Sequence, residues 1–220
     1  MTEQLLEPRM APPQDWATAI FLLALVLVTI SRTVFEKRFA DFVRLGISDK
    51  YVKVYRDPGQ MTGGFTILLF LVQLISLSFF ILLALHKFGY AHKSDWLLFI
   101  RIITLLGTFI LAKFLVDNII SVSFNIEEFA EQFNLNKVSY RTYLALLLLP
   151  VNAILYYNDA PEIVYFVLIG AILTINLLTY LLALKNYQNF IVGKLFYFIL
   201  YLCALEIGPY YFMYYWFIRD

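Results

Sequence analysis

The chain has 220 residues, of which 61% are hydrophobic and only 15% are charged, and its formal net charge is +1. Soluble domains carry about a quarter charged residues, so this composition indicates a protein that lies largely in lipid. The small net charge produces no overall field that would recruit nucleic acid. The single cysteine, Cys203, excludes an internal disulfide and has no metal-binding or redox spacing around it.

Six apolar windows organise the rest of the chain. A helix needs about 20 apolar residues to cross a hydrocarbon core about 30 Å thick. We therefore expect an all-α membrane bundle over residues 16–218, preceded by a polar, proline-rich tail at 1–15. The expected spans are 16–31, 65–85, 96–116, 142–157, 163–184 and 190–215. They leave no room for a separate soluble catalytic domain.

The first long loop, after the first span, is basic and amphipathic. Phe35, Phe39, Phe42 and Val43 recur at helical spacing with charges on the other face, which predicts an amphipathic helix at 33–45. Two interpretations stay open. The helix lies on the membrane surface and binds anionic lipid, or it serves only as an elbow between two spans.

The second long loop, residues 118–140, is acidic where the first is basic. Ile126, Phe129, Ala130 and Phe133 predict the apolar face of a second amphipathic helix, with glutamates on the opposite face. The two loops could dock on each other, or together present a surface to a partner. The span that follows contains Pro150 and is expected to be kinked.

The distribution of basic residues predicts the orientation. Twelve lie in the loops on one side of the expected spans: Arg32, Lys37, Arg38, Arg44, Lys50, Lys53, Arg56, Lys113, Lys137, Arg141, Lys185 and Lys194. Four lie on the other side: Arg9, Lys87, Lys93 and Arg219. The excess of Lys and Arg marks the cytoplasmic side, so both long loops should be cytoplasmic and both termini should lie outside.

The last span carries a carboxylate and a proline. An ionisable group in hydrocarbon is costly and needs a partner or a purpose. Glu206 is such a group, and Pro209 frees the carbonyl of Leu205 because proline has no N–H. Counting about 1.5 Å per residue places Arg101 roughly 8 Å and Glu206 roughly 12 Å below the outer edge.

These depths suggest that Arg101 and Glu206 pair inside the bundle. One interpretation is a polar pocket that opens to the outer leaflet and includes Pro209 with Tyr201 or Tyr210. The other is structural: the pair pins two spans together, or Arg101 only extends to the interface.

A deeper set of amides comprises Gln73, Asn152 and Asn176. Amides in spans usually form hydrogen bonds between helices, and the alternative is a substrate path. His86 and His92 lack a third nearby ligand, and no sequence motif indicates a nucleophile, a phosphate loop or a metal helix. We therefore expect no metal, no cofactor and no catalytic residue.

The segment Phe196-Tyr-Phe-Ile-Leu-Tyr-Leu-Cys-Ala-Leu-Glu-Ile-Gly-Pro209 supports a resemblance. It resembles a family of small multi-span inner-membrane proteins from Bacteroidetes that is described only as a domain of unknown function and has a C-terminal Glu-Ile-x-Pro element. The resemblance covers most of the chain. It implies a bacterial inner membrane with periplasmic termini, and it implies no reaction, substrate or catalytic residue.

Two functions follow as hypotheses. The first is a non-enzymatic subunit, scaffold or assembly factor of a cell-envelope complex, with a membrane-protein partner or a second copy of itself and with membrane lipids around it. The second is a transporter or membrane enzyme that handles lipid or a small solute at an outer-leaflet site formed by Arg101 and Glu206, with Glu206 as the titrating group.

Overall fold

The computed structural model describes residues 15–46, 51, 54–55, 63–123, 127–158 and 160–186, and all regular structure among them is helical. The elements are α1 (Asp15–Val34), α2 (Glu36–Val43), the short 3-10 turn η1 (Arg44–Gly46), α4 (Gly64–Lys87), α5 (Trp96–Ser123), α6 (Glu127–Tyr157) and α7 (Glu162–Asn186). This confirms the expected all-α class. Five of the described helices are long and apolar enough to cross a membrane, which indicates a membrane protein. The expected sixth span at 190–215 lies outside the described residues.

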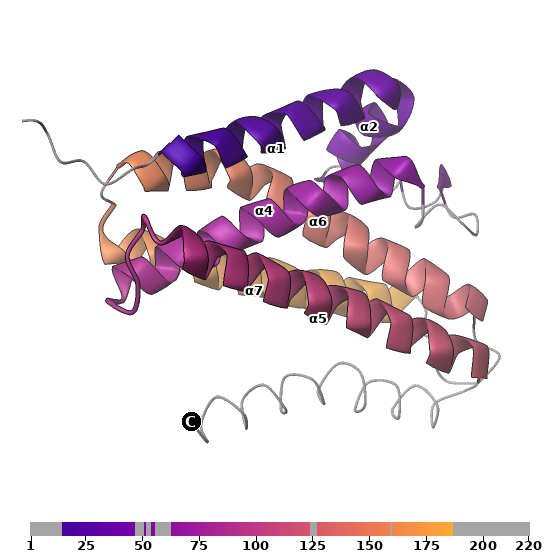
Figure 1. The fold of residues 1–220 in the computed structure, drawn as a ribbon. Helices are drawn as coiled ribbons and strands as arrows, with labels where there is room; N and C mark the ends of the chain where they lie inside the picture. The colour runs from indigo at the N-terminus through magenta and orange to yellow at the C-terminus, as the bar shows by residue number, and fades with distance from the viewer. Residues whose placement is uncertain are drawn as a thin grey trace, which may run out of the picture.

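Helix α4 forms the centre of the described bundle. It packs against α1, α5 and α6, while α7 packs against α6. Figure 1 shows α4 passing between α1 and α5. Helices α1 and α4 are antiparallel, because Phe21 stacks on Phe79 while Phe35 meets Phe65 near the opposite ends. Among residues in the most apolar part of each helix, 61% are buried in α4 and only 6% in α5 and in α7.

The two ends of the bundle differ in construction. At one end, which we call the His86 end, a turn over residues 88–95 joins α4 to α5. Gly89 adopts a φ of 82°, which glycine tolerates without steric cost. The ring nitrogen Nδ1 of His86 lies 3.0 Å from the carbonyl oxygen of Ala91. Asp95 caps α5 by accepting a 3.0 Å hydrogen bond from the backbone N–H of Leu98.

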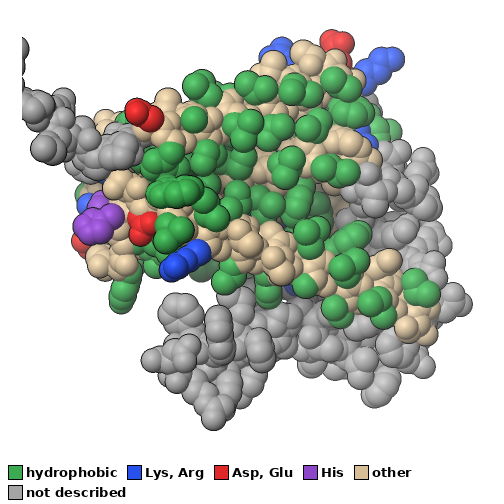
Figure 2. Space-filling view, viewed as in Figure 1, with side chains coloured by type: hydrophobic (Ala, Val, Ile, Leu, Met, Phe, Trp, Pro, Cys, Tyr) green, Lys and Arg blue, Asp and Glu red, His purple; other side chains and the backbone are tan. Residues whose placement is uncertain are grey.

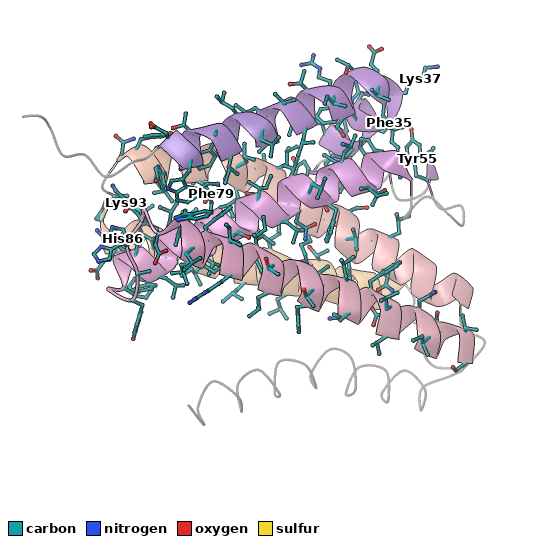
Figure 3. The ribbon with its side chains drawn as sticks, viewed as in Figure 1. Phe35, Lys37, Tyr55, Phe79, His86 and Lys93 are labelled. Carbon is teal, nitrogen blue, oxygen red and sulfur yellow. The ribbon has the colours of Figure 1, made fainter. Side chains whose placement is uncertain are left out.

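The opposite end, which we call the α2 end, contains α2, η1, Tyr51 and Tyr55. Figure 3 shows Phe35 and Tyr55 there, far from His86 and Lys93. Phe42 is buried, and Phe35 and Phe39 are partly buried against residues of α4 and α6. Most of the apolar face of α2 therefore packs on protein, as in an elbow between spans, while Val43 is 46% exposed. Binding of anionic lipid by this helix stays a prediction.

The expected inter-span segment at 118–140 is helical over most of its length, but its helix was wrongly expected to be separate from the following span. Residues up to Ser123 complete α5, and α6 begins at Glu127 and runs through Pro150 to Tyr157. The expected second amphipathic helix is therefore the first part of α6 and not a separate element. The error has a physical cause: a fall in hydropathy marks the edge of the apolar layer, whereas a helix ends only where its backbone bonding is interrupted.

Candidate functional site

A row of hydrogen bonds joins α4 to α6 through buried polar side chains. We call Gln73 and Ser76 of α4, with Thr142 and Asn152 of α6, the polar seam. The hydroxyl of Thr142 donates to Oε1 of Gln73 over 2.7 Å. Nδ2 of Asn152 donates to the carbonyl oxygen of Ser76 over 2.7 Å and lies 3.3 Å from its Oγ. All four residues are buried, so these bonds are made away from solvent.

The hydroxyl of Ser76 has a second role in the polar seam. It donates to the backbone carbonyl of Ala145 over 2.7 Å. This carbonyl lies in the helical turn before Pro150, where the missing N–H of proline removes the usual donor to the carbonyl of Leu146. Donors from a neighbouring helix commonly support the backbone at such prolines in membrane helices. The polar seam therefore fixes α4 beside the interrupted part of α6.

The polar seam consists of neutral groups. Serine, threonine, asparagine and glutamine hold no charge at physiological pH, and hydrogen bonds between membrane helices average about 0.6 kcal/mol. Such a row sets the rotation and depth of two helices. Asn176 is not part of it, because its Nδ2 donates to the carbonyl of Ile172 on its own helix over 2.8 Å. Of the three amides expected deeper in the membrane, Gln73 and Asn152 thus lie in the polar seam, and Asn176 lies apart from it on α7.

An aromatic cluster around Arg38 forms the α2 end. The guanidinium carbon of Arg38 lies 4.7 Å from the ring centre of Phe65 and 5.1 Å from that of Tyr55, so the cation rests over two rings. Its Nε lies 3.4 Å from the hydroxyl of Tyr51 and its Nη2 3.3 Å from Oγ1 of Thr66. Burial raises the pKa of the Tyr51 phenol, and the nearby Arg38 partly opposes that rise.

A small cavity of about 10 Å³ lies beneath this cluster, enough for a single water molecule. Its lining combines aromatic rings with hydroxyl groups: Phe42, Tyr51, Phe65, Thr66, Leu69, Leu135, Val138, Ser139 and Thr142. Thr142 belongs to both the cavity wall and the polar seam. Polar groups therefore extend from the cavity at the α2 end, through Thr142, into the contact between α4 and α6.

The expected outer-leaflet set is only partly visible. Arg101 is exposed on α5, one and a half turns after the helix begins at Trp96. Glu206, Pro209, Tyr201 and Tyr210 lie outside the described residues, so the pairing of Arg101 with Glu206 stays a prediction. Within the described ranges no group of three or more His, Cys, Asp or Glu is placed to hold a metal ion.

Several of these residues have no distinctive pattern in the sequence. Ser76 and Thr142 are ordinary small polar side chains, and Thr142 stands at the edge of an apolar window. Tyr51 and Thr66 flank a segment without a clear periodic pattern. The one available signal was the repeat of Phe35, Phe39 and Phe42, which marked an apolar face without saying what it contacts.

The described helices thus define a class: an all-helical protein with five helices able to cross a membrane, a neutral polar contact between two of them and a basic elbow at one end. Over residues 17–217 the chain matches the family described as "Domain of unknown function (DUF4271)", and it belongs to that family. Neither the curated proteins nor the solved structures include a match to this chain.

Proposed function

We propose that the chain is a non-enzymatic protein of a bacterial inner membrane, where it acts as a subunit, scaffold or assembly factor of a cell-envelope complex. The observation that carries this proposal is the basic surface of the α2 end. Its aromatic cluster holds α2 against α4 and α6, and the side chains of Arg32, Lys37 and Arg44 are exposed on it. Figure 3 shows Lys37 pointing away from the bundle.

The orientation follows from charge. Basic residues concentrate in the sequence around the α2 end, and this bias supports a cytoplasmic location for that end. Figure 2 shows hydrophobic side chains over the middle of the visible face and charged ones toward its ends. With six spans, both termini then lie in the periplasm.

The packing of α2 on α4 and α6 suits a scaffold because a partner can dock without first ordering the backbone of this helix. Arg32, Lys37 and Arg44 give this surface a positive potential, which favours an acidic cytoplasmic partner and speeds its encounter. The neutral polar seam supports the same proposal, since it positions helices and offers no titrating group for chemistry.

Native mass spectrometry of the protein, extracted gently from its own membrane, tests this function. We expect a stoichiometric protein partner that is lost when Lys37→Glu and Arg44→Glu are combined. The matched control is Lys87→Glu at the His86 end, which should retain the partner. Loss of the partner from both variants, or no partner in the wild type, contradicts the proposed surface.

A second candidate function rests on Arg101. An exposed cation on an apolar helix is costly in hydrocarbon, and we propose Glu206, at a similar expected depth in the expected sixth span, as its counter-ion. In this alternative the pair forms an outer-leaflet site for a lipid or small solute.

The second candidate is tested by charge exchange. Arg101→Glu and Glu206→Arg should each lower the yield of folded protein, and the double variant should restore it if the two groups pair. Glu206→Gln in folded protein should abolish binding of a copurifying lipid or solute if the pair is a working site. Retained binding in that variant contradicts the carrier function and leaves the scaffold function standing.

A further inference from the structure

Two buried polar atoms on one face of α6 have no hydrogen-bond partner among the described residues. They are Oδ1 of Asn152 and the hydroxyl oxygen of Tyr156. Both side chains are 0% exposed. Leaving a buried polar group without a hydrogen-bond partner destabilises a protein, so two such groups one turn apart require an explanation.

The orientation of Asn152 is fixed by its neighbours. A backbone carbonyl only accepts hydrogen bonds, so the Nδ2 group must face the carbonyl of Ser76, 2.7 Å away. The amide oxygen Oδ1 then points to the other side of the side-chain amide and remains an acceptor. Rotation of the amide would break two contacts with Ser76, so Asn152 cannot turn to find another donor.

Tyr156 is fixed as firmly. Its ring meets three others edge-on. The distance between ring centres is 6.1 Å to Phe21 and to Phe79, and 6.4 Å to Trp16. Residues four apart share one face of a helix, and helical side chains lean toward the N-terminus. The Tyr156 side chain therefore leans toward Asn152. Trp16 contributes a third buried atom without a partner, its donor Nε1.

We propose that a buried water molecule bridges the Tyr156 hydroxyl and Oδ1 of Asn152. The phenol donates to the water, and the water donates to the amide oxygen. A buried water typically makes about three hydrogen bonds, and the N–H of Trp16 provides a further donor on the same side of the bundle. The polar seam then continues from Thr142 through Ser76 to a hydrated site near the His86 end, independently of the proposed function.

Replacing Tyr156 with phenylalanine tests the bridge by the sign of its effect. If the hydroxyl holds a water on Asn152, Tyr156→Phe should lower the thermal midpoint in bilayers by about 2–4 °C. If the hydroxyl is dry and unpartnered, its removal should leave the midpoint unchanged or raise it, which overturns the proposal. Tyr157→Phe is the matched positive control. Its hydroxyl bonds directly to Thr18 Oγ1 over 2.6 Å, so its removal should lower the thermal midpoint.

A spectroscopic measurement keeps the proposal open to test even if Tyr156→Phe does not fold. Water-edited solid-state NMR of the wild-type protein should show rapid magnetisation transfer from water to the Asn152 side-chain amide, close to the rate at exposed Asn158. Asn176, whose Nδ2 is bonded to the carbonyl of Ile172 on its own helix, should receive it more slowly. Transfer to Asn152 as slow as that to Asn176 overturns the proposal, and so does a bound organic solute in place of water.

Discussion

Helix α4 and helix α7 are both apolar enough to cross a membrane, with α4 the more apolar, and they differ in surroundings. Most of the apolar part of α4 is buried against three other helices, whereas only 6% of that of α7 is. The buried helix is also the one with polar side chains facing its neighbour, at Gln73 and Ser76. In a membrane, hydrocarbon is as apolar as leucine, so burial is decided by polar and shape-specific contacts and not by hydropathy.

The largest expected effect tests this comparison by making the same substitution, leucine to alanine, once in α4 and once in α7. Leu82→Ala removes a side chain that is 0% exposed in α4, and the cavity should cost about 2–5 kcal/mol of unfolding free energy. Leu173→Ala in α7, where the leucine is 65% exposed, should cost less than about 0.5 kcal/mol. Unfolding in denaturing detergent measures both. Equal losses would show that another segment or a second copy covers α7.

A smaller effect sharpens the role of the polar seam. Gln73→Leu and Thr142→Val should each destabilise the protein by about 1–2 kcal/mol, because each leaves one buried polar group without its partner. The double variant should lose less than the sum, since both partners are then apolar. The measurement is a double-mutant cycle on unfolding free energy. Strict additivity would mean that the two side chains are not coupled.

The smallest effect extends the comparison of buried with exposed groups to the α2 end. Burial raises the pKa of Tyr51 above its usual 10.0, so the unfolded chain ionises first as pH rises. The part of the unfolding free energy that is linked to the Tyr51 phenol is therefore fully present below pH 10 and is lost as pH rises above it. Tyr51→Phe should make the fall in thermal midpoint above pH 10 shallower. Tyr90→Phe, at a side chain 81% exposed, is the matched control. A fall of unchanged steepness in Tyr51→Phe contradicts the prediction.

The sequence predicted the helical class well because long apolar windows require helices in lipid. It misplaced the connection between α5 and α6, since hydropathy detects the membrane edge and both helices extend beyond it. It identified Gln73 and Asn152 as polar groups in spans but not their partners Ser76 and Thr142. Those partners become apparent only once α4 and α6 are known to be parallel neighbours, with α5 between them in the chain. Arg101 and Glu206 remain a prediction.

The parallel pairing of α4 with α6 has a consequence for biosynthesis. Thr142 follows Gln73 by 69 residues, and Asn152 follows Ser76 by 76. At about 5–20 residues per second, the ribosome needs roughly 3–14 s to make the first of these separations. During that interval α4 emerges before the helix that satisfies its glutamine. Helix α4 should therefore remain near the insertion machinery, or near another polar chain, until α6 arrives.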